Sequence, residues 1–213
     1  MTIWAVDSEN TKLVDDAFSL SLRQGILHLD VYIAAPGLYM MNMPSFFEEM
    51  LNHWATPSWY GMLREHFTYH PDYLLHSLDV SKECLHISYT RSHHSLSDGY
   101  VTLSNTPTIS RVASEDLIDK SSYSNRSYAR ETVSSVMKLT NQCLSQWCDV
   151  RDIPLLHNKP TRSSEPEPSY AGFTSPLRKF PDLVNQIQIL SYLSQGRARY
   201  SDSQLIAWSS RWS

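Results

Sequence analysis

The sequence predicts a single domain of the α+β class. The chain has 213 residues, 41% of them hydrophobic, which suffices for one sizeable core and is short for two ordinary domains. Its opening third is rich in β-branched and aromatic residues, and its later part carries apolar residues at three- and four-residue steps. Because the strand patterns mostly precede the long helical ones, instead of alternating with them, the α+β class is favoured.

The strand patterns come first along the chain. Residues 2–6 (TIWAV) and 17–35 (AFSLSLRQGILHLDVYIAA) favour strands, and Arg23-Gln24-Gly25 is a suitable hairpin turn within the second segment. Alternation of polar and apolar residues predicts further strands at 83–91, 98–103 and 108–113.

Four segments carry helix patterns. A short helix is expected over 45–54, where Ser45 can cap the free amide groups and Glu48 occupies the capping-box position. The longest apolar stripe predicts a helix over 127–150. Later helices are expected over 181–196, ending near Gly196, and over 201–212.

A polar, proline-broken stretch interrupts the second half of the chain. Thr161 to Ser169 reads TRSSEPEPS and has no periodicity, so 158–169 is expected to be a loop or tether. We therefore expect one domain over 1–213, made of a β/α part at 1–157 and a second part at 170–213.

The composition argues against several classes of protein. The net charge of -4 argues against a simple polycationic binder of nucleic acid, and DNA is not an expected partner. No apolar run approaches the roughly 18 residues of a membrane span, and the first residues lack a secretory signal. Three cysteines without zinc-site spacing favour a reducing compartment, which is the cytoplasm or, in a eukaryote, an organelle interior.

Three aspartates lie within ten residues near the start. Asp7, Asp15 and Asp16 stand in the stretch AVDSENTKLVDDAFSL, and residues 1–50 carry a net charge of -5. Carboxylates that converge can hold a hard cation and leave positions open for a phosphodiester and a water, so a magnesium site is one hypothesis, with manganese as the alternative ion. A polar turn with solvated acids is the other.

A basic segment lies far downstream, in a region, 151–213, of net charge +3. In FTSPLRKFPDL, Phe173 to Leu183, Arg178 can hold a phosphate bidentately, Lys179 adds a second charge, and Ser175 offers a hydroxyl. The segment is interpreted as a phosphate clamp or, alternatively, as a basic pair at a loop-to-helix junction.

Both stretches resemble motifs of one family. AVDSENTKLVDDAFSL resembles the acidic motif that opens the catalytic RNB domain of the ribonuclease II/R exoribonucleases, and YAGFTSPLRKFPDLVNQ is similar to that family's Thr-Ser-Pro-Ile-Arg-Arg/Lys-Tyr-Pro-Asp-Leu signature. DVYIAAPGLYM and LHSLD, at 75–79, are similar to two motifs between them. The resemblance covers most of the chain and implies a mixed, mostly antiparallel sheet packed by helices.

The resemblance also implies a function. Active members thread single-stranded RNA into a channel and use magnesium to release nucleoside monophosphates from the 3′ end. Carried over, Asp7, Asp15 and Asp16 match three of four family acids, Asp15 being the catalytic one, and Arg178 matches the arginine near the scissile phosphate. Tyr60 is aligned loosely with the aromatic that stacks on the terminal base. The RNA-binding set implied by the resemblance is Tyr60, Ser175, Arg178 and Lys179.

Three departures concern the metal site. Leu13 stands in place of the fourth family acid, Ala35 replaces an aspartate and Gln186 replaces a histidine. Losing coordination for a second ion costs several kcal/mol of transition-state stabilisation, and about 4 kcal/mol is roughly a thousandfold in rate. Compensation by Glu9, in the same loop, is the route by which catalysis could survive.

Two functional hypotheses follow. The first is a shortened, partly degenerate RNB-type domain that binds RNA or protein with weak or no catalysis, for example as a subunit of a larger protein or ribonucleoprotein assembly. The second is a compact magnesium-dependent 3′→5′ exoribonuclease. The residue that divides them is Leu13, because an apolar side chain beside the acids predicts no second metal.

Overall fold

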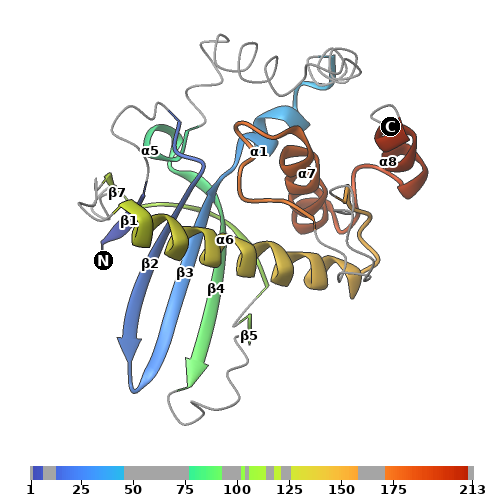
Figure 1. Cartoon of the computed structure of the whole chain (residues 1–213). Helices are drawn as coiled ribbons and strands as arrows, with labels where there is room; N and C mark the ends of the chain where they lie inside the picture. Colours follow the sequence, from blue (N-terminus) through green and yellow to red (C-terminus); the bar gives the residue numbers. More distant parts are fainter. Residues whose placement is uncertain are drawn as a thin grey trace.

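A seven-stranded sheet organises the molecule (Figure 1). The computed structural model describes residues 2–6, 13–45, 77–92, 102–103, 106–113, 118–120, 126–157 and 171–210. Within these, the strand order is β5-β4-β3-β2-β1-β7, and β6 also pairs with β4. The strands are β1 (Ile3–Ala5), β2 (Asp16–Arg23), β3 (Ile26–Ala34), β4 (Glu83–Ser92), β5 (Thr102–Leu103), β6 (Thr108–Arg111) and β7 (Ile118–Lys120).

The predicted α+β class and sheet type are confirmed. Every described strand pair is antiparallel except β1 and β7, which run parallel, so the sheet is mixed and mostly antiparallel. The strands at 83–91 and 108–113 are confirmed as β4 and β6. No helix among the described residues is both long and apolar enough to cross a membrane.

The β2–β3 hairpin forms as the sequence predicts. Its register runs from Asp16 opposite Ile33 to Arg23 opposite Ile26, which leaves a two-residue turn. Gln24 and Gly25 have positive φ angles of 52° and 75°. A turn with two residues in that region matches the right-handed twist of the flanking strands, which explains the tight connection.

The long helix α6 (Arg126–Asp149) covers one face of the sheet (Figure 1). Its bounds agree with the predicted helix at 127–150. Leu144 and Trp147 pack with Val31 and Ile87 of the central strands in one apolar cluster. Cys143 and Cys148 are buried free thiols on the same helix, as core residues of that size should be.

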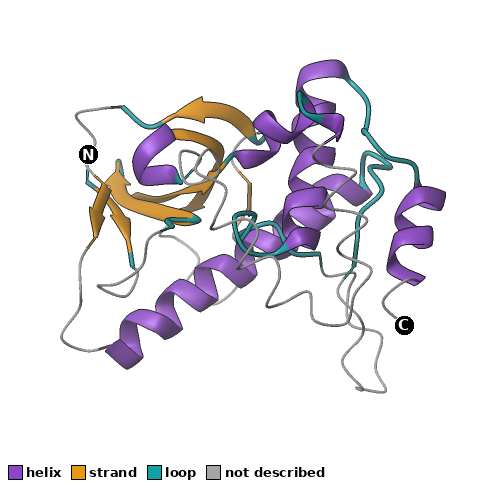
Figure 2. Cartoon of the chain, turned by 90° about the horizontal axis from the view of Figure 1, so that it is seen from above, coloured by secondary structure: helices purple, strands orange, loops and turns teal. Residues whose placement is uncertain are grey.

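The helix α7 (Phe180–Gln195) lies at the centre of a second apolar cluster. Leu183 and Ile187 join Ile3 of β1 and Ala17 of β2 there, so residues on both sides of 158–169 share one core. Gly196, at φ 71°, ends the helix as expected. A further helix, α8 (Asp202–Ser209), begins at a Ser201 capping box and lies on the side away from the sheet (Figure 2).

Some elements were missed by sequence reasoning. The helix α1 (Pro36–Met41) is only six residues long, α5 (Leu78–Ser81) is one turn, and β7 is three residues that pair with β1 from across the chain. Periodicity has too few residues to act on in segments this short. The expected helix beyond Ser45, the start of the strand at 98–103 and the tether at 158–169 lie outside the described residues.

Candidate functional site

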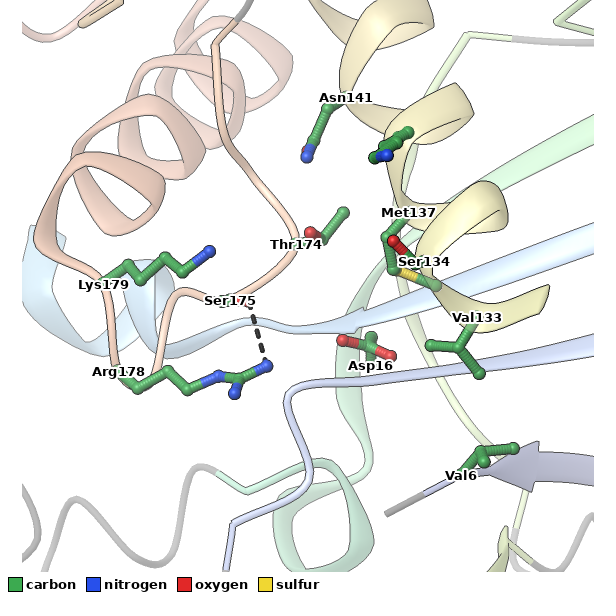
Figure 3. Close-up of a pocket in the computed structure, with 11 residues that line it drawn as sticks. Val6, Asp16, Val133, Ser134, Met137, Asn141, Thr174, Ser175, Arg178 and Lys179 are labelled. Carbon is green, nitrogen blue, oxygen red and sulfur yellow. Dashed lines mark hydrogen bonds between the residues drawn. The ribbon is translucent and has the colours of Figure 1, made fainter. Parts of the chain in front are cut away.

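A pocket of about 320 Å³ lies between α6, the start of β2 and the loop that precedes α7 (Figure 3). Residues 171–179 of that loop contain the Ser-Pro-Leu-Arg-Lys sequence and are called the motif loop below. Polar side chains from all three elements reach the pocket. The described lining residues are Val6, Asp16, Val133, Ser134, Met137, Lys138, Asn141, Thr174, Ser175, Arg178 and Lys179.

The motif loop is held through its alternate backbone N–H groups. Each of four donates to a side-chain oxygen that comes from elsewhere in the chain, at 2.8 to 3.1 Å. Because buried backbone donors without acceptors are costly, these bonds fix the loop's conformation. The pairs are Ala171 with Ser145 Oγ, Phe173 with Asn141 Oδ1, Ser175 with Asp182 Oδ2, and Leu177 with Asp15 Oδ1.

Asp15 joins the two sequence motifs directly. Its Oδ1 accepts the Leu177 N–H at 2.8 Å, and its Oδ2 lies 2.8 Å from Nε of Arg178. The Asp15 side chain is 5% exposed, whereas that of Arg178 is 61% exposed. An acid near the start of the chain and the arginine far downstream therefore meet, and Asp15 binds the loop with both oxygens.

Arg178 and Lys179 present positive charge to the pocket. Nη2 of Arg178 donates to Ser175 Oγ at 3.3 Å, so Asp15 and Ser175 together orient its guanidinium (Figure 3). Lys179, which is also exposed, extends from the end of the loop. An oriented guanidinium beside an ammonium is suited to an anion with several oxygens, such as a phosphate.

Of the three predicted metal ligands, Asp16 alone is seen to line the pocket. Asp16 is half-buried at the start of β2, while Asp7 lies outside the described residues, as do Tyr60 and Glu9. Within the described part of the chain, no group of three or more His, Cys, Asp or Glu side chains could hold a metal. The Arg178 guanidinium paired with Asp15 also disfavours a second cation at that carboxylate, so the described residues do not by themselves form a magnesium site.

A buried carboxyl supports the motif loop from behind. Burial raises the pKa of Asp182, while the charges of Lys179 and Arg178 and the N–H of Ser175 act in the opposite direction. A Cβ at Gly172 would lie 2.3 Å from Asp182 Oδ1. Glycine is therefore required at that position by the carboxyl that braces the loop.

The departures from the family motifs serve packing in this chain. Leu13 is partly buried against the apolar cluster around α7, and Ala35 is buried immediately before α1. Gln186 donates to the carbonyl of Ala34 at 2.6 Å and accepts the N–H of Gly37 at 3.0 Å. An amide has both a donor and an acceptor, so it can satisfy both backbone groups at once.

Three pocket residues were missed by sequence reasoning. Ser134, Lys138 and Asn141 all come from α6 and line the pocket. Their four- and three-residue spacing places them on one helix face, which is the pattern that could have indicated them. The apolar stripe is the stronger pattern in this helix, and polar helix residues usually face solvent, so these three were not indicated.

The fold of this chain is similar to that of a solved exoribonuclease. One matching structure is an active-site mutant of the Dss1 exoribonuclease from Candida glabrata, with a TM-score of 0.61 and 15% sequence identity. The match covers 100% of this chain and 42% of that chain, and at such low identity it concerns the fold alone. Neither a protein-family model nor a curated protein matches the sequence.

Proposed function

We propose that this protein binds single-stranded RNA in the pocket beside the motif loop and has lost efficient hydrolysis. The observation that carries the proposal is the state of Asp15, whose two carboxylate oxygens hold Leu177 and Arg178. The ion pair places a guanidinium where its charge disfavours a metal cation at Asp15, and it orients that guanidinium for a phosphate. Recognition of the RNA backbone and loss of the metal are thus supported by one structural feature.

RNA binding at this pocket is supported by its positive charges and its hydrogen-bond donors. Arg178, Lys179 and Lys138 line one pocket, together with the hydroxyls of Thr174 and Ser175. Cationic side chains that neutralise phosphates release counterions, which gives affinity without sequence preference and a strong dependence on salt. The fold's similarity to an exoribonuclease favours RNA among the polyanions.

The loss of efficient hydrolysis is supported by the ligands that a magnesium ion requires. Magnesium binds oxygen ligands in a near-octahedral arrangement and needs lone pairs that are free to coordinate. Each Asp15 oxygen accepts an N–H donor, and a magnesium ion on another lone pair of this carboxylate would lie beside the Arg178 guanidinium, whose like charge repels it. That repulsion opposes metal binding at Asp15, and Leu13 supplies no further oxygen.

The second candidate is a compact magnesium-dependent 3′→5′ exoribonuclease that releases nucleoside monophosphates. The similarity to the Dss1 exoribonuclease and the presence of Asp16 in the pocket favour it. It requires Asp15 to bind the metal beside the Arg178 guanidinium, or to exchange that ion pair for the metal when RNA binds.

The proposal is tested with purified protein and an end-labelled unstructured RNA, with fluorescence anisotropy for binding and gel analysis for cleavage, in magnesium, manganese or a chelator. We expect retention of RNA in all three conditions and no mononucleotide release. Lys179→Gln should weaken binding about fivefold to tenfold, or about 1 kcal/mol. The matched control is Arg199→Gln, which removes an exposed charge outside the pocket lining and should change affinity less than twofold.

Two results would overturn the proposal. Mononucleotide release in magnesium that Asp15→Asn abolishes would establish the exoribonuclease. Absence of RNA binding at low salt, or equal losses in both charge variants, would exclude the pocket as an RNA site.

A further inference from the structure

The pocket has cations on two opposite walls. The loop wall consists of Thr174, Ser175, Arg178 and Lys179, and the helix wall consists of Ser134, Lys138 and Asn141 of α6. Figure 3 shows the labelled residues of both walls directed toward the space between them. Lys138 is exposed and belongs to neither of the motifs that predicted the site.

The two walls are fixed relative to one another. Asn141 accepts the Phe173 N–H at 2.9 Å, and Ser145, one turn further along α6, accepts the Ala171 N–H at 3.1 Å. Both acceptors are buried. The backbone of α6 at Lys138 is therefore held at a set separation from the motif loop, and a ligand that spans the walls needs little rearrangement of the backbone on binding.

The size of the pocket limits what can span it. About 320 Å³ is at the low end for ligand sites and suits one nucleotide better than several stacked ones. Each nucleotide inside an RNA strand has one phosphate on its 5′ side and one on its 3′ side. Two phosphates at the ends of one unit match cations on two walls.

We propose that the pocket binds a nucleoside 3′,5′-bisphosphate unit, with one phosphate against Arg178 and Lys179 and the other against Lys138. This inference rests on the proposed function, and it names the smallest unit of RNA that would occupy the pocket. Asp16 lines the same pocket, and its negative charge disfavours a phosphate placed beside it. The two phosphates are thereby directed toward the cationic walls, and the sugar lies between them.

Calorimetric titration with three ligands tests the inference. Adenosine 3′,5′-bisphosphate, adenosine 5′-monophosphate and adenosine 3′-monophosphate are each titrated into the full chain and into Lys138→Gln. We expect the bisphosphate to bind at least about tenfold more tightly than either monophosphate, a difference of about 1.4 kcal/mol. Lys138→Gln should reduce bisphosphate affinity to that of the tighter monophosphate, whose own affinity changes less than twofold. Arg199→Gln should change none of the three.

The outcomes separate this inference from the proposed function. Equal affinity for all three ligands, or equal losses in Lys138→Gln, overturns the two-wall site, while continued RNA binding leaves the proposed function standing. Competition between the bisphosphate and RNA supports both. Tight binding of the bisphosphate by a chain that does not retain RNA supports the site, identifies a free nucleotide as its ligand and overturns the proposed function.

Discussion

The motif loop and the far end of the β2–β3 hairpin are held in opposite ways. In the motif loop, alternate N–H groups are bound by side chains of other segments, from Asp182, seven residues after Ser175, to Asp15, 162 residues before Leu177. The hairpin tip, residues 20–29, is formed by a local turn and by regular strand pairing, both within the hairpin and between β3 and β4. Three of its leucines remain partly exposed, namely Leu20 at 44%, Leu22 at 62% and Leu27 at 39%.

The difference shows which region of the molecule requires particular side chains and which region tolerates substitution. A loop without regular hydrogen bonds keeps one conformation only if particular side chains supply acceptors, so each acceptor is hard to replace. A hairpin tip needs only a suitable turn and strand-forming residues. Substitutions in the motif loop should therefore lower the free energy of unfolding much more than substitutions in the tip.

The largest expected effect is that of Asp15→Ala. It removes the acceptor of the buried Leu177 N–H and the counterion of Arg178, so the free energy of unfolding should fall by about 3 kcal/mol. Urea denaturation measures the loss. Asp15→Asn keeps an oxygen for Leu177 and should lie between the two proteins. A loss below about 1 kcal/mol for Asp15→Ala would show that the loop does not depend on this contact.

A pair of glycine substitutions compares the two regions directly. Gly172→Ala would bring a Cβ within 2.3 Å of Asp182 Oδ1, and the resulting overpacking should cost about 2 kcal/mol. Gly25→Ala, in the hairpin turn, meets no atom within 4 Å and is penalised only by its positive φ, at about 1 kcal/mol. The two values come from the same denaturation experiment, and the reverse order would contradict the comparison.

Asp182→Asn should change the pH dependence of the free energy of unfolding more than it changes the free energy of unfolding at pH 7. Since the pKa of Asp182 is raised in the folded protein, the folded state holds its proton more tightly, and wild-type stability should fall as pH rises from the ordinary carboxyl range through the raised pKa. The asparagine variant should lack this decline and remain within about 1 kcal/mol of wild type at pH 7. Denaturation curves at several pH values measure both, and parallel pH profiles would contradict the expectation.

The smallest effect is expected at the hairpin tip. Leu22→Thr replaces an exposed strand residue by another strand former and should change stability by less than about 0.5 kcal/mol. Val31→Thr in the same hairpin is the matched control, because it buries a hydroxyl at a fully buried site and should cost about 1 to 3 kcal/mol. Thermal melts of the two variants suffice, and similar losses would mean that the tip is covered.

Local patterns in the sequence predict much of this fold. The turn at Gln24-Gly25, the stripe of α6 and the glycine that ends α7 are all read from neighbouring residues, and all three are confirmed. The short β7 is different, because its pairing with β1 is set by residues more than a hundred positions away.

The candidate site was predictable in part. The resemblance of both motifs to one catalytic domain implied that they lie near one another, and the structure places Asp15 against Arg178 as a direct ion pair. What the sequence could not indicate is that the second Asp15 oxygen binds a backbone N–H, since every residue type except proline carries that donor. Lys138 was missed for a related reason, because its place in the pocket lining depends on how its helix packs against the motif loop.

The buried amides of α7 have a consequence for how the domain can vary. Asn185 binds the backbone of Leu156 and Gly172, Gln186 that of Ala34 and Gly37, and Gln188 that of Pro154 and Tyr200. One helix thereby sets the alignment of several separate connections. A slip of α7 by a single residue would break all these hydrogen bonds together, so tolerated changes must keep the phase of this helix even where they alter its length.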